Sequence, residues 1–491
     1  MNEKANVRLS VWLGLAGVAL VLVGVWQIWA AGAGLVSQHL DIEGLPVLVT
    51  SPAGVKPGER PLVLVGHGFA GSASVMRGFA ITLARAGYVV AAWDFDGHGG
   101  NTRSWQASDL LANAEQVLER VEAQGLADTN RVAILGHSMG SGVALAFGQE
   151  HPEAAATIAV SPVDQKVTLQ LPHNLLLMAG SLEAPFLSNA QLRLAEAGGA
   201  GGDPAQGTGR ALVVVPNVEH VSILFAPLTH QTARRWLDQT FGPQPGAEDY
   251  RDLRILWYGV AILGFLLLAN ALAPSAEGNA ARPGLAVSAW RLLAALAGGA
   301  LGAGLLLWLA GRLGLELRSM LGLLVGGYLL VWFGLAGGLG WLAAGFRPGL
   351  PSRKALAGGL VAFLALWAGV GWLGHYVWLH WLLAWPRLVW WPLGVVVCLP
   401  WFMLVGEGVR RSGWAGRLAW WLGQTLLLVV GLSLALMLNP ELSFLNLILP
   451  MFPLVLGAQL LGTARQRSSW SFGLSGAAFV SWIVLSVFPL A

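Results

Sequence analysis

The chain has 491 residues, enough for about three domains of ordinary size. Charged residues make up 11% of it and hydrophobic residues 55%, with a mean hydropathy of +0.62, whereas soluble domains carry about 25% charged residues. This composition excludes a disordered chain and a wholly soluble fold, and it indicates a membrane protein. Residues 251–491 carry 15 basic and 5 acidic residues, while residues 32–250 carry 12 and 20. Because the basic residues flank apolar segments instead of clustering on one polar face, no nucleic-acid partner is expected.

The first apolar segment runs from Leu9 to Ala30, behind Lys4 and Arg8. A secretory signal has an apolar core of about 7–15 residues, so this longer segment predicts an uncleaved transmembrane anchor within residues 1–34. Cleavage near residues 31–33 stays open as the alternative.

Residues 35–248 are expected to form an α/β domain. Apolar runs alternate there with helical patterns, which is typical of a parallel sheet covered by helices on both faces. Leu45–Thr50 is expected to pair antiparallel with Gln38–Ile42 at one edge. The predicted strands are Pro61–Val65, Tyr88–Ala92, Arg131–Leu135, Ala156–Val160, Asn174–Met178 and Ala211–Val215. The predicted helices are Ser72–Ala86, Ser108–Gln124, Met139–Glu150, Phe186–Ala197 and Ile223–Phe241.

One motif in this domain points to chemistry. The predicted strand Arg131–Leu135 runs into Gly-His-Ser-Met-Gly at residues 136–140 and then into a helix. This G-x-S-x-G pattern between a strand and a helix places the serine on a sharp turn, with its Oγ above the sheet and the next backbone N–H at the helix N-terminus. A serine at its ordinary pKa is a poor nucleophile, so a base and an acid are expected further along the chain.

Four other stretches resemble functional turns of the α/β-hydrolase superfamily. They are His-Gly-Phe at 67–69, Asp-Phe-Asp-Gly-His-Gly at 94–99, Gly-Ser-Leu-Glu at 180–183 and Val-Glu-His at 218–220. With the serine motif, they make residues 45–241 similar to this superfamily, whose catalytic residues occur in the order Ser, Asp or Glu, His. The resemblance implies an α/β-hydrolase fold with a mostly parallel sheet.

The resemblance also implies roles for individual residues. Ser138 would be the nucleophile, His220 the general base and then acid, and Glu183 the acid that orients His220. The backbone N–H groups of Phe69 and Met139 would form the oxyanion hole.

The position of the acid has an alternative. Asp164 follows the preceding strand, where other members of the superfamily carry the acid, and Glu183 is preferred to it. The resemblance implies no cofactor, and no cluster of His, Cys, Asp or Glu has the spacing of a metal site. Other histidines of this domain are expected to form turns and hydrogen bonds (His67 and His98), to pack or shape the pocket (His137) or to lie on the surface (His151, His173 and His230).

Residues 249–491 are expected to form a polytopic domain of about eight transmembrane helices, because each apolar segment is long enough to cross about 30 Å of hydrocarbon. With the anchor, this makes an all-α bundle of about nine helices. His375–Trp385 is an alternative interfacial helix, and Asn446, Pro450 and Pro453 interrupt one span. The predicted spans are 253–273, 289–310, 320–344, 355–376, 388–406, 418–438, 442–461 and 470–490.

Basic residues predict the orientation. With a cytoplasmic N-terminus and nine crossings, 12 basic residues lie at cytoplasmic ends and 5 at the opposite ends, in agreement with the positive-inside rule. The α/β domain is then extracytoplasmic, in a periplasm or at the cell surface. The cytoplasmic set is Lys4, Arg8, Arg282, Arg291, Arg347, Arg353, Lys354, Arg410, Arg411, Arg417, Arg465 and Arg467, and the opposite set is Arg251, Arg254, Arg312, Arg318 and Arg387.

The sequence therefore predicts a membrane-bound serine hydrolase that cleaves carboxylic esters of small molecules or lipids through an acyl-enzyme on Ser138. Amides, peptides and thioesters stay open, because the fold does not choose among them. Few residues separate Asp164 from the strand at Asn174, where many relatives insert a lid, so the site is expected to be open or covered by something else. The membrane bundle or the bilayer is the hypothesis for that cover. The alternative is a transport or assembly protein whose hydrolase-like domain only binds a partner.

Overall fold

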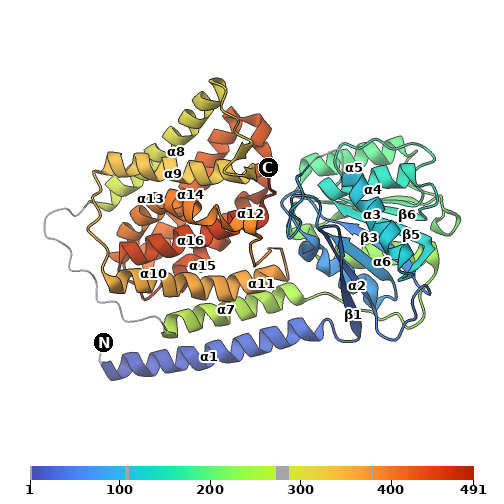
Figure 1. Ribbon diagram of the computed structural model, residues 1–491, viewed down its shortest axis with the longest axis horizontal. Coiled ribbons are helices and arrows are strands. Elements are labelled where there is room, and N and C mark those ends of the chain that lie inside the picture. Colours follow the sequence, from blue (N-terminus) through green and yellow to red (C-terminus); the bar gives the residue numbers. More distant parts are fainter. Residues whose placement is uncertain (1–2, 106–109, 273–286, 379) are drawn as a thin grey trace.

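The computed structural model describes residues 3–105, 110–272, 287–378 and 380–491. The chain forms two halves that lie side by side (Figure 1). The sheet half comprises residues 35–250, and the helical half comprises α1 (Glu3–Ala30) together with residues 254–491. The C-terminus lies at the junction of the two halves (Figure 1), where the Leu490 N–H donates a hydrogen bond to the Gly97 carbonyl oxygen at 2.9 Å.

The sheet half contains an eight-stranded, mostly parallel sheet. Its strands are β1 (Leu35–Ile42), β2 (Leu45–Pro52), β3 (Pro61–Gly66), β4 (Val89–Trp93), β5 (Asp128–His137), β6 (Ala156–Val160), β7 (Leu175–Gly180) and β8 (Arg210–Val215). They are ordered β1-β2-β4-β3-β5-β6-β7-β8. β2 pairs antiparallel with both β1 and β4, and all pairs from β4 to β8 are parallel. The predicted sheet and its antiparallel edge are confirmed.

Helices cover both faces of this sheet. They are α2 (Arg77–Arg85), α3 (Leu110–Ala123), α4 (Met139–Glu150), α5 (Ala184–Glu196) and α6 (Pro227–Phe241), with 3₁₀ turns η1 (Ala73–Met76), η3 (Pro204–Gln206) and η4 (Ser222–Phe225). Along β3, Val63 and Val65 face a core shared with α2 and α6, whereas Leu62 and Leu64 face a core shared with α3 and α4. Strands that are apolar on both sides require this double cover. The first two residues of the predicted helix Ser108–Gln124 lie outside the described residues.

The helical half is a bundle with a few short irregular elements. Its elements after α1 are α7 (Arg254–Leu272), α8 (Ala289–Arg312), β9 (Ser319–Met320), β10 (Leu323–Leu324), α9 (Gly326–Ala344), α10 (Arg353–Leu366), the π-helical turn η5 (Trp367–Gly371), α11 (Trp372–His375), α12 (Trp385–Leu388), α13 (Trp391–Arg410), α14 (Trp414–Leu438), the 3₁₀ helix η6 (Pro440–Met451), α15 (Phe452–Gly462) and α16 (Ser469–Val487). Within the described ranges, nine helical stretches are long and apolar enough to cross a membrane. The bundle therefore indicates a multi-pass membrane protein, as predicted.

Three details of the bundle differ from a simple row of spans. Helix α9 begins at Gly326 and not near residue 320, because β9 and β10 pair there as a short hairpin and the Leu324 N–H donates to the Pro489 carbonyl oxygen at 2.8 Å. The alternative of an interfacial helix at 375–385 is wrong, since among the described residues α11 ends at His375 and α12 begins only at Trp385. The interrupted span is a 3₁₀ helix, η6, followed by α15, as expected where prolines remove backbone donors.

The N-terminal helix lies along α7 at the edge of the bundle (Figure 1). Glycine allows the two helices to approach closely, since a Cβ atom added at Gly24 would lie 2.7 Å from the Ala261 Cβ and 2.8 Å from the Trp257 carbonyl oxygen. Helix α1 is otherwise mostly exposed, whereas α16 is mostly buried at the centre of the bundle. Small residues at the contact are the usual way for helices to associate in a membrane.

Candidate active site

The serine of the G-x-S-x-G motif occupies the tight turn between β5 and α4. Ser138 has φ 52° and ψ −118°, a conformation that costs a non-glycine residue about 1–3 kcal/mol. The flanking glycines make room for the turn, because a Cβ atom on Gly136 would lie 1.9 Å from the Gly140 carbonyl oxygen. The Ser138 N–H donates to the Val160 carbonyl oxygen at 2.9 Å, which ties the turn to β6.

Three predicted residues meet above the carboxyl ends of the strands. His220 Nε2 lies 3.0 Å from the Ser138 Oγ, and His220 Nδ1 lies 2.8 Å from the Glu183 Oε2. All three residues are buried. Ser138 follows β5, Glu183 follows β7 and His220 follows β8, and the carboxyl ends of parallel strands reach one edge of a sheet. Three residues that are spread over 83 positions of the sequence are thus joined in a continuous chain of hydrogen bonds.

The two candidate acids lie in different surroundings. Glu183 is held by two donors besides His220: the Ser161 Oγ donates to its Oε1 at 2.8 Å and the Gly180 N–H at 2.5 Å. Asp164 instead has an 83% exposed side chain and pairs with Arg193 at 2.7 Å. Of the two, Glu183 is the carboxylate that contacts the histidine.

Burial controls the protonation of this site. It lowers the pKa of His220 to about 4, so the imidazole is neutral near pH 7 and can accept a proton. Burial raises the pKa of the Glu183 carboxyl, and the hydrogen bonds from Gly180 and Ser161 oppose that rise. Burial also lowers the pKa of His137 to about 3. Neutral His137 donates from Nε2 to the His220 carbonyl oxygen at 3.0 Å and thereby fixes the backbone of the candidate base.

The candidate oxyanion hole lies beside the serine. A Cβ atom on Gly68 would lie 3.1 Å from the Ser138 Cβ and 2.9 Å from the His137 Nδ1, so glycine lets the loop after β3 approach the serine turn closely. Within the described residues, nothing accepts a hydrogen bond from the Phe69 or Met139 N–H. Met139 is the first residue of α4, where backbone N–H groups have no partner inside the helix. Two free donors are therefore available near the Ser138 Oγ.

A polar network supports the loop after β3. Asp94 accepts from the Ala73 N–H at 2.7 Å and from the Gly100 N–H at 2.8 Å. His67 Nε2 accepts from the Phe95 N–H at 3.0 Å, so its Nδ1 carries the hydrogen that it donates to the Gly68 carbonyl oxygen at 2.7 Å. The predicted turn roles of His67 and Asp94 agree with this geometry, which connects the ends of β3 and β4.

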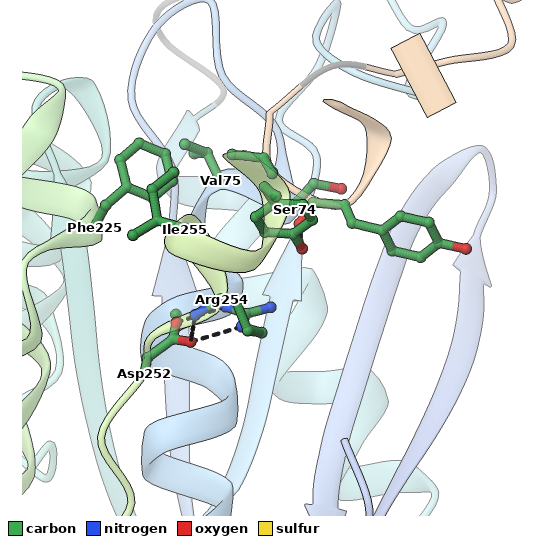
Figure 2. Close-up of a pocket in the computed structure, with 10 residues that line it drawn as sticks. Ser74, Val75, Phe225, Asp252, Arg254 and Ile255 are labelled. Carbon is green, nitrogen blue, oxygen red and sulfur yellow. Dashed lines mark hydrogen bonds and ion pairs between the residues drawn. The ribbon is translucent and has the colours of Figure 1, made fainter. Parts of the chain in front are cut away.

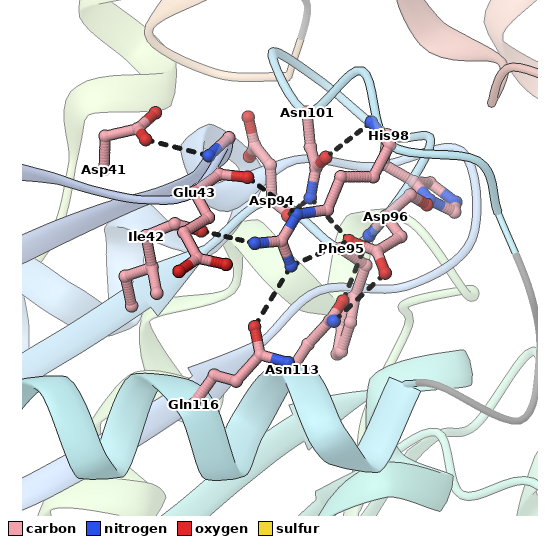
Figure 3. A network of polar contacts seen from close by, with 12 residues as sticks. Asp41, Ile42, Glu43, Asp94, Phe95, Asp96, His98, Asn101, Asn113 and Gln116 are labelled. Carbon is pink, nitrogen blue, oxygen red and sulfur yellow. Dashed lines mark hydrogen bonds and ion pairs between the residues drawn. The ribbon is translucent and has the colours of Figure 1, made fainter.

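A second carboxylate, that of Asp96, anchors the turn at residues 94–99 to the rest of the sheet half. Asp96 accepts from Asn101 Nδ2 at 2.9 Å and from Asn113 Nδ2 at 3.2 Å, and Arg103 approaches it at 3.8 Å (Figure 3). Arg103 also donates to the Gln116 Oε1 at 3.0 Å. The donors and acceptors of this buried network satisfy one another, so the turn is a rigid support.

Some residues of the site had no clear signal in the sequence. Ser161, which lies at φ 48° after β6, donates to Glu183, and its place at the carboxyl end of a parallel strand was the available clue. Phe186 stacks on the His220 ring with centroids 4.0 Å apart. Trp378 and Phe444 reach the loop after β3 from the helical half, and sequence patterns do not identify contacts between such distant segments.

The prediction that His230 lies on the surface is wrong. Its side chain is buried on the inner face of α6, donates from Nε2 to the Leu224 carbonyl oxygen at 2.8 Å and packs against Phe79 with ring centroids 4.6 Å apart. The single periodic pattern of α6 does not distinguish this inward position from an outward one.

A small cavity of about 10 Å³ lies where α7 meets the sheet half (Figure 2). Beside it, Asp252 accepts from Arg254 Nε and Nη2, each at 2.8 Å, and from the Tyr250 hydroxyl at 3.1 Å. This volume holds about one water molecule, so it is a junction and not a substrate site. In the described part of the chain, no group of three or more His, Cys, Asp or Glu side chains is placed to hold a metal ion.

Part of the chain matches a known protein family. Residues 58–211 match the Hydrolase_4 family, described as serine aminopeptidase, S33. This part of the chain is an α/β-hydrolase domain. Over 137 residues the chain is 31% identical to an uncharacterised protein of Mycobacterium tuberculosis (28% of this chain and 45% of that protein). Over 137 residues it is also 31% identical to the esterase YjfP of Escherichia coli K12 (25% of this chain and 53% of that protein).

The chain spans about half the length of the curated relatives that it matches. Among solved structures, a soluble variant of the monoglyceride lipase of Saccharomyces cerevisiae aligns at 15% identity with a TM-score of 0.31, over 41% of this chain and 94% of that protein. The bacterial heroin esterase aligns at 16% identity with a TM-score of 0.35, over 46% of this chain and 91% of that protein. The family match, over residues 58–211, lies within the sheet half.

Proposed function

We propose that the protein is a membrane-bound serine hydrolase that cleaves carboxylic esters through an acyl-enzyme on Ser138. The observation that carries the proposal is the buried chain of hydrogen bonds from Ser138 through His220 to Glu183. A nucleophile, a neutral imidazole and a carboxylate in hydrogen-bond contact are the parts that acyl transfer requires. The similarity to an esterase supports an ester as the substrate.

In the first step, the Ser138 Oγ attacks the ester carbonyl carbon while its proton moves to His220 Nε2. The carbonyl electron pair moves onto the oxygen, and the free N–H groups of Phe69 and Met139 donate hydrogen bonds to this oxyanion. Glu183 stabilises the imidazolium that forms. The tetrahedral intermediate then expels the alcohol, which takes the proton from His220 and leaves the acyl group on Ser138.

In the second step, water hydrolyses the acyl-enzyme. His220 Nε2 accepts a proton from the water as its oxygen attacks the acyl carbon, and the same two backbone N–H groups stabilise the second oxyanion. Collapse of this intermediate releases the carboxylic acid and returns the proton to the Ser138 Oγ. The low pKa of His220 keeps the base neutral before each attack.

A fluorophosphonate probe tests the nucleophile. The full-length protein in detergent is expected to be labelled once, and Ser138→Ala is expected to abolish labelling and to lower kcat on p-nitrophenyl butyrate about 10⁴–10⁶-fold. The matched control is Ser141→Ala, because the Ser141 Oγ donates only to the Ser138 carbonyl oxygen and accepts from the Val163 N–H. Wild-type protein that stays unlabelled, or equal labelling of Ser138→Ala, would contradict the enzyme and favour a binding module.

The choice between ester and amide is tested with paired substrates. The matched family is described as an aminopeptidase, whereas one relative is called an esterase. Aminoacyl and butyryl p-nitroanilides are compared with the corresponding p-nitrophenyl esters, with Ser138→Ala as the blank. We expect the esters to be hydrolysed and the anilides not, and the reverse order would assign the protein to the amidases.

We also propose the domain limits and orientation that the charge distribution favours: an anchor at 1–34, a hydrolase domain at 35–248 outside the cytoplasm and a polytopic domain at 249–491. Single cysteines test the orientation, because the native Cys398 is buried. Glu122→Cys in the sheet half is expected to react with a membrane-impermeant maleimide in intact cells or spheroplasts. Leu350 lies on the loop between α9 and α10 and is 94% exposed. Leu350→Cys is expected to react only after lysis. The opposite labelling pattern of the two cysteines would invert the orientation.

A further inference from the structure

The helical half holds the loop that carries the candidate oxyanion donor. We define the oxyanion loop as residues 67–72. The Trp378 indole N–H donates to the Ala70 carbonyl oxygen at 2.7 Å, and the Ser72 hydroxyl donates to the Trp378 carbonyl oxygen at 2.8 Å. Trp378 lies just after α11, more than 300 residues further along the chain. Trp378 therefore both donates a hydrogen bond to the oxyanion loop and accepts one from it.

The conformation of the oxyanion loop needs such support. The Gly71 N–H donates to the Gly68 carbonyl oxygen at 3.0 Å, which closes a four-residue turn. Ala70 occupies the third position of the turn with φ 57°, where glycine is strongly favoured. A non-glycine residue keeps such a conformation when surrounding contacts impose it. The bond from Trp378 is made to the carbonyl group of this strained residue.

A second contact fixes the side chain of the same turn. The Phe69 ring meets the Phe444 ring of η6 edge to face, with centroids 4.6 Å apart, and it also contacts the His98 ring at 5.4 Å. Ala70 itself is 1% exposed and is buried in the core of the helical half. The turn sets the direction of the Phe69 N–H, because that group belongs to the peptide between Gly68 and Phe69.

We propose that Trp378 and Phe444 are positioning residues of the catalytic site, through which the helical half orients the Phe69 N–H toward the developing oxyanion. This inference rests on the proposed hydrolase activity. It makes the helical half part of the catalytic apparatus and not only an anchor. Loss of one oxyanion donor lowers kcat about 10²–10³-fold in other serine hydrolases, so a misdirected donor is expected to lower it by about 10–100-fold.

The test compares Trp378→Phe with Trp381→Phe in the full-length protein. Phenylalanine keeps an aromatic ring but has no indole N–H. Trp381 is a matched control, because its indole N–H donates to the Trp367 carbonyl oxygen at 3.2 Å within the helical half. Trp378→Phe and Phe444→Ala are each expected to lower kcat on p-nitrophenyl butyrate about 10–100-fold with KM changed less than threefold. Trp381→Phe is expected to stay within about twofold of the wild type in both constants.

A second substitution separates positioning from damage to the fold. Ala70→Gly removes the strain at φ 57°, because glycine adopts positive φ readily. We expect Ala70→Gly to restore about half or more of the logarithmic loss in kcat when it is added to Trp378→Phe. Active sites are counted by the end point of fluorophosphonate labelling, so kcat refers to folded protein even where a variant yields less of it.

Each outcome bears on a different statement. If Trp378→Phe and Phe444→Ala have the same kcat per labelled site as Trp381→Phe, the positioning role is wrong. A rise in KM with unchanged kcat also contradicts it, because it would place these residues in substrate binding. If the wild type itself is neither labelled nor active, the proposed hydrolase function fails before the positioning role is reached.

Discussion

The two halves of the molecule differ in how they hold several of their buried charges. In the sheet half, the buried carboxylates of Asp94, Asp96 and Glu183 accept hydrogen bonds from nearby backbone and side-chain donors, and all three lie near one edge of the sheet. In the helical half, the buried Arg387 and Arg417 donate to backbone carbonyl oxygens. Buried negative charge is thus stabilised by hydrogen-bond donors in the first case, and buried positive charge by backbone carbonyl oxygens in the second.

All but one of the carbonyl groups that these arginines use lie at or near helix ends, and the exception is that of Gly97. Arg387 donates to the carbonyl oxygens of Leu485, at 2.6 Å, and Phe488, near the C-terminus of α16, and to that of Gly97 at 2.7 Å. Arg417 donates to the carbonyl oxygens of Thr463 and Gln466 just after α15. The last carbonyl groups of a helix have no partner inside it and carry partial negative charge. Helix ends thus take the place of carboxylates, which are scarce in residues 251–491.

The difference also shows what each half does with its polar groups. In the sheet half, Glu183 contacts His220 beside Ser138, whereas Asp94 and Asp96 hold turns in place. In the helical half, Arg387 and Arg417 lock segments together. Arg387 does this across the junction, because it ties α16 and the turn at Gly97 to one guanidinium group. The following substitutions test whether this distinction is real.

The largest effect is expected at the candidate acid. Glu183→Gln keeps the shape but loses the charge that stabilises the imidazolium and selects its tautomer, so kcat is expected to fall about 10⁴-fold. Asp164→Asn is the matched control and is expected to stay within about twofold, because Asp164 is exposed and pairs with Arg193. Steady-state kinetics on p-nitrophenyl butyrate distinguish them, and a larger loss for Asp164→Asn would exchange the two assignments.

The next effect concerns the buried arginine at the junction. Arg387→Met removes the donors to three carbonyl oxygens and leaves them buried, which is expected to destabilise the protein by about 2–4 kcal/mol. Arg312→Met, at the exposed C-terminus of α8, is expected to change stability by less than about 0.5 kcal/mol. Thermal or denaturant unfolding in detergent measures both. Equal stability of the two variants would show that the hydrogen bonds of Arg387 to these carbonyl oxygens do not stabilise the protein.

The pH profile should reveal the burial of His220. Protonated His220 cannot accept the Ser138 proton, so kcat/KM is lost as the pH falls through the pKa of the folded protein, about 4. An imidazole with the ordinary pKa of 6.5 would already lose about 97% of the activity at pH 5, whereas here about 90% should remain. Initial rates between pH 3.5 and 8 measure the acid limb, with protein stability checked at each pH. An acid limb near 6.5 would mean that water reaches the imidazole.

The smallest effect is expected at the contact between α1 and α7. Gly24→Ala places a methyl group within 2.8 Å of the Trp257 carbonyl oxygen, and we expect a loss of about 1–2 kcal/mol in stability with unchanged kcat. Gly259→Ala is the control in α7, because open space surrounds that position, and there the better helix propensity of alanine is expected to be neutral or stabilising. A kcat loss in Gly24→Ala alone would extend the positioning role to the anchor.

Much of the fold was predictable from the sequence because its signals are local. Runs of apolar residues between turns identify strands β3 to β8, and the length of apolar segments identifies the nine candidate spans. The glycines around Ser138 mark the serine turn because a side chain at Gly136 would collide with Gly140. Such signals do not describe how distant segments meet. His230 and the start of α9 were mispredicted for this reason, as their surroundings come from α2 and from the C-terminal residues.

The sequence by itself determined an α/β domain and the apolar helices, because periodicity and length are local properties of the chain. The resemblance of its motifs to the α/β-hydrolase superfamily added a short set of candidate residues. Tertiary structure placed Glu183, and not Asp164, in contact with His220, since both follow neighbouring parallel strands and only the packing brings one carboxylate to the imidazole. It also brought Trp378 to Ala70. That contact depends on how the two halves dock, and the physical reason is that a hydrogen bond needs proximity in space and leaves no pattern along the chain.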